Sequence, residues 1–255
     1  MLILIPPAKT IDFDIPARDI QTTQPEFLEE AQFLADRLRK YSPSRLQKLM
    51  NINHKLADLN AKRYLDWHQP FAETNAKPAV LVFKGEVFTG LKADEFDIQE
   101  LGFSQEHLRI LSGLYGILRP LDLMQPYRLE MGTKLKTRRG KDLYGFWGSK
   151  ITNAINRTLK DSGQGILVNL ASTEYFKSID ASKINAEIFT PTFKDYSNGQ
   201  YKFLTAYGKR ARGIMARFII KNRIKDVEQL KLFEDDGYYY NDKLSEGNKW
   251  VFTRG

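Results

Sequence analysis

The sequence predicts a mixed α/β (α+β) fold, in which helices flank a mixed, largely antiparallel sheet within a single domain of residues 1–255. Short apolar runs bounded by turn residues, as in strands, alternate with longer segments whose apolar residues recur at helical spacing. An Asn-Gly pair between two alternating apolar segments predicts an antiparallel hairpin. The chain shows no internal repeat, no low-complexity region and no linker longer than a few residues.

The composition is that of a globular protein with a positive net charge. Hydrophobic residues make up 42% of the chain, which is ample for a packed core. The formal net charge is +8 and the pI about 9.4, which points to an anionic partner. The absence of cysteine excludes a disulfide framework, a thiolate metal site and thiol-based peroxide chemistry. With no signal peptide and no apolar run long enough for a membrane span, we expect a cytoplasmic protein, and a monomer.

The first part of the chain predicts one strand followed by helices. LILIP is a short buried strand, and the prolines after it hold an extended segment that contains Lys9. Residues 26–41 follow helical spacing, with acidic residues in the first turn, where the helix dipole favours anions. Two shorter helices follow, SRLQKLM and HKLADLNAKRYLDW. AVLVF predicts a buried strand that leads into Lys84 and Glu86, whose side chains point the same way if the strand continues.

The segment 107–133 mixes apolar and charged residues and is expected to line a cleft. Arg109, Arg119, Arg128 and Glu130 are interleaved with apolar residues that suit a core. A buried charge needs a partner or a ligand. The alternative is a structural Arg–Glu network that holds loops in place.

The elements in and around this segment differ in how clearly they are predicted. SQEH, which precedes RILSGL, predicts the first turn of a helix, whereas RILSGL itself suits a helix or a strand. KLKTRRGK, after the segment, predicts a solvated, mobile basic loop, and the alternative is a loop that embraces a phosphate backbone. Residues 149–161 form an amphipathic helix, and the strand ILVNLAS ends at Ser172, which is expected to cap the helix that contains Glu174.

The C-terminal part predicts a hairpin, a basic helix and a last strand. AEIFTPTFKDY and QYKFLTAY are strands joined at Asn198-Gly199. KRARGIMARFIIKNRI is a helix with apolar residues on one side and basic residues elsewhere. NKWVFTR is a strand that must join a sheet, because its apolar residues need burial.

Only three residues, Asn51-Ile52-Asn53, separate the two short helices, so the chain must turn sharply there. Such turns need backbone conformations near the left-handed region, which Asn tolerates best after Gly. LMNINHKLA is similar to the helix-hairpin-helix DNA-binding motif, with Asn51 and Asn53 in place of its two glycines. In that motif, backbone N–H groups and a lysine bind successive phosphates. The alternative is an ordinary antiparallel helix pair with a solvated basic face.

Several common sites have no motif in the chain. There is no GxxxxGK[ST] loop and no GxGxxG after a strand, and the three histidines make no metal pair. We therefore expect no cofactor and no metal site. A carboxylate site for iron finds little support, because no carboxylate quartet shows helical spacing.

Nearly the full length of the chain resembles the YaaA family of bacterial peroxide stress proteins. The resemblance rests on the blocks PAKTIDF, LADLNAKRY, FKGEVFTGL, HLRILSGLYGILRPLDLMQPYRLEMGT, LYGFW, VNLASTEYF, KRARGIMARFI and WVFTR. Glu86 and Phe88 depart from the expected form FKGDVYxGL. The resemblance implies one mixed α/β domain with a helix-hairpin-helix at about residues 42–67. It also implies a positively charged cleft, binding to double-stranded and distorted DNA, a role in limiting oxidative DNA damage and free iron, and no established enzymatic reaction.

The leading hypothesis is a cytoplasmic, DNA-binding stress protein that grips phosphates without reading bases. Asn51, Asn53 and Lys55 are expected to hold one strand. The residues expected to contact DNA are Lys48, Asn51, Asn53, Lys55, Lys62, Arg63, Lys209, Arg210, Arg212 and Arg217.

The competing hypothesis is an enzyme that acts on an anionic, nucleotide-like small molecule in a polar cleft. A dense content of Arg, Lys and Glu suits anion binding and acid–base chemistry. The residues expected to line this cleft are Lys9, Lys84, Glu86, Arg109, Arg119, Arg128, Glu130, Ser172 and Glu174.

Overall fold

Strand β1 (Leu2–Ile5) lies at the centre of the fold, and its four side chains are fully buried. The structure is a computed structural model that describes residues 1–16, 18–163 and 165–255. An uninterrupted apolar run suits a strand that is covered on both faces, as in parallel sheets. The sequence therefore places this strand in the interior of the protein.

The central sheet has the strand order β6-β5-β1-β8-β9. Its remaining strands are β5 (Leu108–Ser112), β6 (Gly116–Leu118), β8 (Ile166–Asn169) and β9 (Glu187–Phe189). β1 pairs in parallel with both neighbours, so that Ile3 lies opposite Leu108 and Val168. β8 and β9 are also parallel, whereas β5 and β6 are antiparallel. The long connections between the parallel strands contain helices, because a parallel pair needs a crossover.

A second sheet, with the order β11-β10-β13-β12, is formed by the C-terminal part of the chain. Its strands are β10 (Thr192–Ser197), β11 (Gln200–Lys202), β12 (Tyr239–Tyr240) and β13 (Val251–Arg254). The chain crosses from β9 to β10 at Pro191, which has no N–H to donate. Thr190 and Thr192 donate instead to Asn248 and Trp250. The segment AEIFTPTFKDY, predicted as one strand, is therefore two strands in two sheets.

The described residues also form two short antiparallel ladders. They are β2 (Thr10–Ile11) with β4 (Phe83–Lys84), and β3 (Lys77–Pro78) with β7 (Leu123–Met124). The β2–β4 ladder joins the segment after β1 to the start of α5, because Thr10 lies opposite Lys84.

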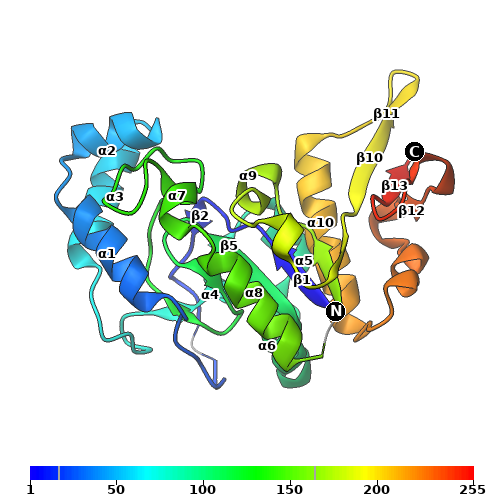
Figure 1. Ribbon diagram of the computed structural model, residues 1–255, viewed down its shortest axis with the longest axis horizontal. Helices are drawn as coiled ribbons and strands as arrows, with labels where there is room; N and C mark the ends of the chain where they lie inside the picture. Colours follow the sequence, from blue (N-terminus) through cyan, green and yellow to red (C-terminus); the bar gives the residue numbers. More distant parts are fainter. Residues whose placement is uncertain (17, 164) are drawn as a thin grey trace.

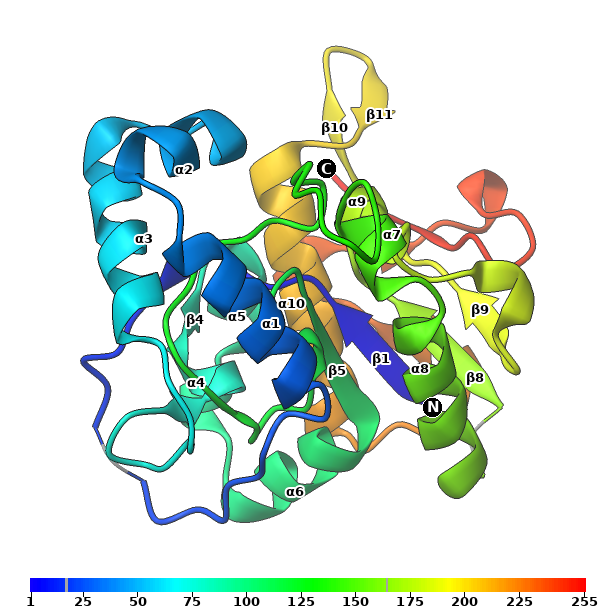
Figure 2. The ribbon, with the colours of Figure 1, turned by 60° about the vertical axis from the view of Figure 1, so that its left-hand side comes forward.

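Helices surround the sheets (Figures 1 and 2). The α-helices are α1 (Leu28–Arg39), α2 (Pro43–Met50), α3 (His54–Asp66), α4 (Ala79–Val82), α5 (Glu86–Leu91), α6 (Ile98–His107), α7 (Leu143–Trp147), α8 (Lys150–Asp161), α9 (Thr173–Phe176) and α10 (Thr205–Lys221). The 3-10 helices are η1 (Ala93–Glu95), η2 (Ala181–Lys183), η3 (Val227–Leu232), η4 (Asp235–Gly237) and η5 (Asp242–Leu244). Over the described ranges, no helix has both the length and the apolar character that a membrane span requires.

Helix α10 contacts β1 and packs closely on α5. Glycines allow the close approach, because a Cβ at Gly213 would overlap the carbonyl oxygen of Val87 and lie 2.8 Å from the Leu91 nitrogen. Gly90 makes the reciprocal contact, with the backbone of α10 at Arg210 and Ile214. The block FKGEVFTGL, which contains α5, therefore forms one structural unit with the basic helix α10.

The predicted mixed α/β class is confirmed, including the hairpin at Asn198-Gly199, where both residues have positive φ (52° and 79°). The second sheet is mainly antiparallel, with one parallel pair between β10 and β13. In the central sheet the balance is opposite to the prediction, since three of its four described pairings are parallel. Hairpin signals are local in sequence, whereas the partner of a parallel strand lies far away along the chain, because a parallel pair needs a crossover connection.

Several local predictions are wrong. QYKFLTAY is a strand only at its start, because β11 ends at Lys202 and α10 begins at Thr205. AVLVF is not a strand, because Ala79 to Val82 form the short helix α4 and only Phe83 enters β4. An all-apolar run of this length has no periodicity, so a single helical turn buries it equally well. Glu86 consequently begins helix α5 and does not continue a strand from Lys84.

The segment SQEH is the last turn of a helix and not the first. Helix α6 begins at Ile98, where Asp97 and Glu100 form a reciprocal capping box. Exposed Ile98 and an internal glycine, Gly102, obscure the helical pattern in the sequence. The ambiguous segment RILSGL after it contains strand β5.

Substitution of Gly213 by alanine is expected to destabilise the protein. The added methyl group overlaps the backbone of α5, so the two helices must separate, at a cost of about 2 to 3 kcal/mol. Gly102→Ala is the control, because no heavy atom lies within 4 Å of a Cβ there. In the α6 interior that change stabilises by up to about 1 kcal/mol. Urea denaturation measures both, and equal midpoints would contradict the close packing of α5 on α10.

Candidate functional site

Helices α2 and α3 are joined by the tight turn that the sequence predicts. Asn51 adopts the left-handed conformation, with φ 50° and ψ 55°, and its N–H donates to the Gln47 carbonyl. Asn53 is extended, with φ −72°, and its side-chain oxygen accepts from the Leu56 N–H at 2.9 Å. Only Asn51 therefore needs the conformational tolerance expected of both asparagines, and Asn53 is the N-cap of α3.

The basic residues around this turn have different environments. Lys48, Lys55 and Lys62 are exposed. Arg63 is half-buried, and its Nη1 donates to the side chain of Asn60 at 3.4 Å. Burial lowers the pKa of Arg63, and the neighbouring guanidinium of Arg128 lowers it further. Arg63 thus lies against the body of the protein, whereas the three lysines point to solvent.

A charged cluster links four segments that are distant in sequence. Lys9 Nζ lies 2.7 Å from one carboxylate oxygen of Glu130, and Arg128 Nη2 lies 3.0 Å from the other. The hydroxyl of Tyr64 in α3 donates to the Arg128 carbonyl at 2.5 Å. The Gly132 N–H donates to the Glu174 carboxylate at 2.8 Å. The loop 125–133 is thereby held between α3, the segment after β1, and α9.

This cluster lies at the carboxyl edge of the central sheet. Lys9 follows β1, and Glu174 follows β8, its parallel neighbour. After β1 the chain continues to β5 on one side, and it returns to β8 on the other. Ligands of open α/β sheets bind at such a switch point, just beyond the strand ends.

The remaining predicted residues near this edge have structural contacts or lie on its rim. The Ser172 hydroxyl accepts from the Tyr175 N–H at 3.5 Å, so Ser172 caps α9 as predicted. Lys84 lies opposite Thr10 in the β2–β4 ladder and is half-buried. Glu86 is exposed in the first turn of α5.

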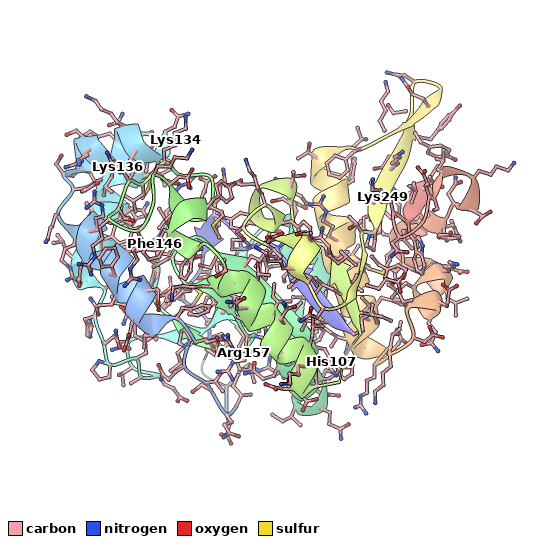
Figure 3. All side chains as sticks on the ribbon, viewed as in Figure 1. His107, Lys134, Lys136, Phe146, Arg157 and Lys249 are labelled. Atoms are coloured by element: carbon pink, nitrogen blue, oxygen red, sulfur yellow. The ribbon has the colours of Figure 1, made fainter. Side chains whose placement is uncertain are left out.

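A cavity of about 540 Å³ connects the α2–α3 turn with the charged cluster. Its lining residues are Lys48, Leu49, Met50, Asn51, Glu130, Gly132, Thr133, Lys134 and Glu174. Lys134 lies beside α2, and Lys136 is near it (Figure 3). Lys48 and Asn51, which the sequence assigns to DNA binding, therefore line the same cavity as Glu130 and Glu174, which it assigns to the polar cleft. The contribution of Lys134 had no signal beyond its place in a basic loop.

That basic loop is held against α1. The guanidinium groups of Arg138 and Arg139 lie 5.2 and 5.0 Å from the ring centroid of Phe33. Arg139 and Lys150 also pair with Glu30, at 3.7 and 3.0 Å. Cation–π contacts and ion pairs thus anchor a segment that the sequence predicts as mobile and solvated.

The basic residues of α10 divide into exposed and structural ones. Lys209 and Arg210 are exposed. Arg212 is half-buried, lies 5.5 Å from the ring centroid of Phe203, and has a pKa lowered by burial. Arg217 pairs with Glu95 at 2.7 Å and donates to the Leu91 and Lys92 carbonyls. This side chain joins α10 to the segment after α5, so it is engaged within the protein.

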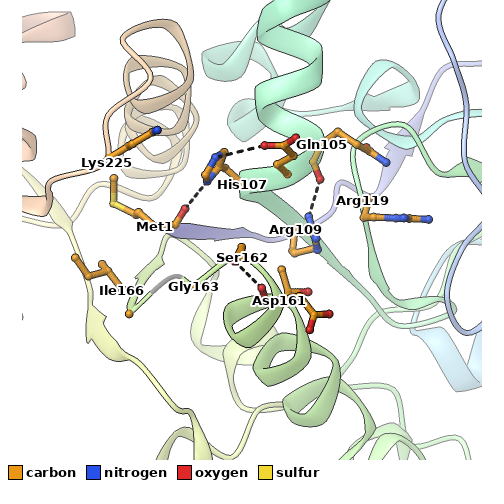
Figure 4. A pocket seen from close by; sticks show the side chains of 13 residues that line it. Met1, Gln105, His107, Arg109, Arg119, Asp161, Ser162, Gly163, Ile166 and Lys225 are labelled. Carbon is orange, nitrogen blue, oxygen red and sulfur yellow. Dashed lines mark hydrogen bonds and ion pairs between the residues drawn. The ribbon is translucent and has the colours of Figure 1, made fainter.

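The structure places Arg109 and Arg119 away from the other predicted cleft residues. They line a separate cavity of about 830 Å³ beside Met1, at the amino end of β1 (Figure 4). Arg109 is 9% exposed and donates to the Gln105 and Leu108 carbonyls at 2.9 and 2.8 Å. Burial, together with the charge of Arg119, lowers the pKa of Arg109 to about 10. Arg119 pairs with Asp122 at 3.0 Å.

These two arginines therefore match the structural Arg–acid network that the sequence left open as an alternative. Guanidinium groups that bind helix-end carbonyls and a buried aspartate are already satisfied. Nothing in the residue types distinguishes them from Arg128. The topology of the sheet, and not the type of residue, decides at which end of the central sheet a side chain lies.

In residues 1–16, 18–163 and 165–255, no three His, Asp or Glu side chains come together so that they could hold a metal ion. Glu130 and Glu174 are engaged by cations and by a backbone N–H. The chemistry that the cluster supports is the binding of charged groups.

The α2–α3 turn and the charged cluster line one cavity at the carboxyl edge of the mixed central sheet. The protein is therefore a mixed α/β protein with a polar, charged cleft. Residues 1–244 match the sequence model of a family described as peroxide stress protein YaaA. The chain belongs to this family.

Full-length relatives support the same assignment. A UPF0246 protein from Saccharophagus degradans is 52% identical over 254 residues, which cover 100% of this chain and 99% of the relative. A UPF0246 protein from Cellvibrio japonicus is 53% identical, with 100% and 98% covered. One from Colwellia psychrerythraea is 52% identical, with 100% and 99% covered.

The substitution Tyr64→Phe is expected to lower the free energy of unfolding by about 1 to 2 kcal/mol, because it removes the donor to the part-buried Arg128 carbonyl. Tyr239→Phe is the matched control, since Tyr239 is 57% exposed and its change should cost less than about 0.5 kcal/mol. Denaturant titrations measure both variants. A Tyr64 variant as stable as the control would show that this hydrogen bond does not hold the loop to α3.

Stability is expected to fall in acid partly because of His107. Its Nδ1–H donates to the Met1 carbonyl at 3.0 Å, and burial lowers its pKa, so the unfolded chain binds the proton more tightly. The free energy of unfolding should therefore decrease as pH falls through the unfolded histidine's pKa, about 6.5. Denaturation from about pH 8 to about pH 5 should show a steeper loss for wild type than for His107→Gln. If the stability of both proteins fell equally with pH, His107 would not be the group responsible for the loss.

Proposed function

We propose that this protein binds DNA in the peroxide stress response and grips the phosphate backbone without reading bases. The observation that carries the proposal is the α2–α3 turn, a helix-hairpin-helix in this interpretation, which presents exposed Lys48 and Lys55 beside the N-terminus of α3. Membership of a peroxide stress family supports the physiological context.

The charge pattern at the start of α3 supports anion binding. The helix dipole favours Asp or Glu in a first turn. The first turn of α3 has no acidic residue and contains His54 and Lys55. The first N–H groups of a helix have no intrahelical acceptor, and the Asn53 cap satisfies the one at Leu56. A phosphate at this position would complete the pattern with backbone N–H groups and flanking ammonium groups.

Other basic side chains extend the contact surface. Lys62 lies on α3, Lys134 borders the shared cavity, and Lys209 and Arg210 lie near the start of α10. Both ribbon views show α2 and the N-terminal end of α10 on the same side of the molecule (Figures 1 and 2). A duplex that crosses this side would meet cations at both ends of the cleft, which suits sequence-independent binding. Arg63, Arg212 and Arg217 support this surface through packing.

Protection of DNA follows from the same proposal. Protein that covers the sugar–phosphate backbone limits its exposure to oxidants, which would link binding to lower oxidative damage. The described residues do not form a group of three potential metal ligands. The proposed role in limiting free iron therefore rests on the family resemblance alone.

A second candidate function is an enzyme for an anionic, nucleotide-like small molecule. The cavity of about 540 Å³ has the size of small-molecule sites, and Nε of Arg128 is buried without a hydrogen-bond partner among the described residues. The carboxylates of this site are already engaged, Glu130 by two cations and Glu174 by a backbone N–H. These contacts favour an organising role for them over acid–base chemistry.

The double variant Lys48→Glu/Lys55→Glu is expected to weaken binding to unrelated duplex sequences alike, by about tenfold or more. Because each lysine–phosphate contact releases a counterion, the slope of log affinity against log salt should also fall by about 2. Fluorescence anisotropy at several salt concentrations measures both quantities.

The control is Lys160→Glu/Lys249→Glu, which makes the same change in net charge at exposed positions on α8 and near β13. It should retain most of the affinity and the salt slope. If a folded Lys48/Lys55 variant bound duplex DNA as tightly as this control, the α2–α3 turn would not be the DNA-binding element.

A further inference from the structure

Four aromatic side chains are exposed on and beside the β10–β11 hairpin. Tyr196 is 54% exposed, Tyr201 36%, Phe203 43% and Tyr207 51%. Large aromatic residues are usually buried, so a group of exposed ones marks an interaction surface. The exposed large aliphatic residues of the described chain lie in other segments. We call these four residues the aromatic arm.

The hairpin holds its rings in defined positions. Tyr196 and Tyr201 are directly opposite each other in the antiparallel pair, with ring centroids 5.3 Å apart and planes at 67°. The Tyr201 hydroxyl donates to the Gly255 carbonyl at 3.2 Å. The Asn198-Gly199 turn, with both residues at positive φ, matches the twist of the strands. The two rings are therefore fixed relative to each other before any ligand arrives.

The surroundings of the arm are strongly cationic. Residues 196–212, which carry the four rings, contain Lys202, Lys209, Arg210 and Arg212 and no Asp or Glu. The guanidinium of Arg212 lies 5.5 Å from the Phe203 ring centroid, and that of Arg254 lies 4.8 Å from the Tyr207 ring centroid. Two acids lie close to the arm, buried Asp195 and exposed Asp236, and both are paired with Arg254, at 2.6 and 2.8 Å. The chemistry presented to solvent is thus aromatic faces among cations.

The arm projects from the body on the same side as the α2–α3 turn, as both ribbon views show (Figures 1 and 2). A strand of nucleic acid bound at that turn would run toward the arm past the start of α10. Exposed rings interleaved with cations form a platform on which bases stack while the backbone is neutralised, as in proteins that bind single strands. Paired bases in a duplex are stacked on each other and do not offer their faces.

We propose that the aromatic arm stacks unpaired nucleobases and so adds a preference for DNA with unpaired bases to backbone binding. The inference deepens the proposed DNA-binding function and rests on it. Aromatic rather than aliphatic side chains favour nucleobases over an apolar protein surface as the occupant. An acidic protein partner would use the cations and would tolerate replacement of the rings by aliphatic residues.

The test compares a duplex, the same duplex with an internal run of unpaired bases, and a single strand. The variant Tyr196→Leu/Tyr201→Leu keeps an apolar surface and removes the rings, whereas Tyr196→Phe/Tyr201→Phe keeps them. The leucine variant should lose about tenfold or more in affinity for the two unpaired probes and about twofold or less for the duplex. The phenylalanine variant should bind all three probes like wild type.

A second readout is the fluorescence of 2-aminopurine placed in the unpaired run, which stacking quenches. Wild type and the phenylalanine variant should quench it, and the leucine variant should not. Tyr207→Leu, at an exposed helical position where leucine is a good helix former, provides the same test if the hairpin variant does not fold.

The outcomes separate this inference from the function on which it rests. If the leucine variants bind and quench the unpaired probes like wild type, the stacking platform is refuted, even when the Lys48/Lys55 variant has lost duplex binding. Equal losses on all three probes also refute it, because stacking acts only on unpaired bases. If wild type binds no probe in a salt-dependent manner, the DNA-binding function itself fails.

Discussion

The parallel pairing of β1 with β5 and β8 is the constraint on which the arrangement of this protein depends. β1 is fully buried, so its backbone groups must be paired on both edges. Parallel strands end at the same edge, which brings the segment after β1 next to the segment after β8. Lys9 and Glu174 thereby reach one side of the sheet, although 164 positions separate them in sequence.

The loop 125–133 converts this edge into a site by supplying charges that need partners. Glu130 is bound by Lys9 and Arg128, and Tyr64 binds the Arg128 backbone from α3. These contacts attach the α2–α3 pair to the sheet. The stability of the cleft and the position of the α2–α3 turn are therefore coupled, because the loop 125–133 contacts both.

The basic residues have two distinct roles, which burial and pairing separate. Those that pair with acids or carbonyls, such as Arg109, Arg119 and Arg217, hold elements together. Those on the turn and on the first part of α10, such as Lys55 and Lys209, are exposed. A net positive charge alone does not distinguish the two groups, and only the second group is available to an anionic partner without the loss of an existing contact.

The sequence by itself determined the local features. These include the α2–α3 turn with Asn51 in the left-handed region, the Asn198-Gly199 hairpin, the Ser172 cap and the amphipathic helices. Each depends on the chemistry of a few consecutive residues. Tertiary structure alone decided which strands pair in parallel, that AVLVF is a helical turn, and that Arg128 and Glu130 lie at one end of the sheet while Arg109 lies at the other. Those outcomes depend on contacts between distant segments, which local periodicity and propensity do not predict.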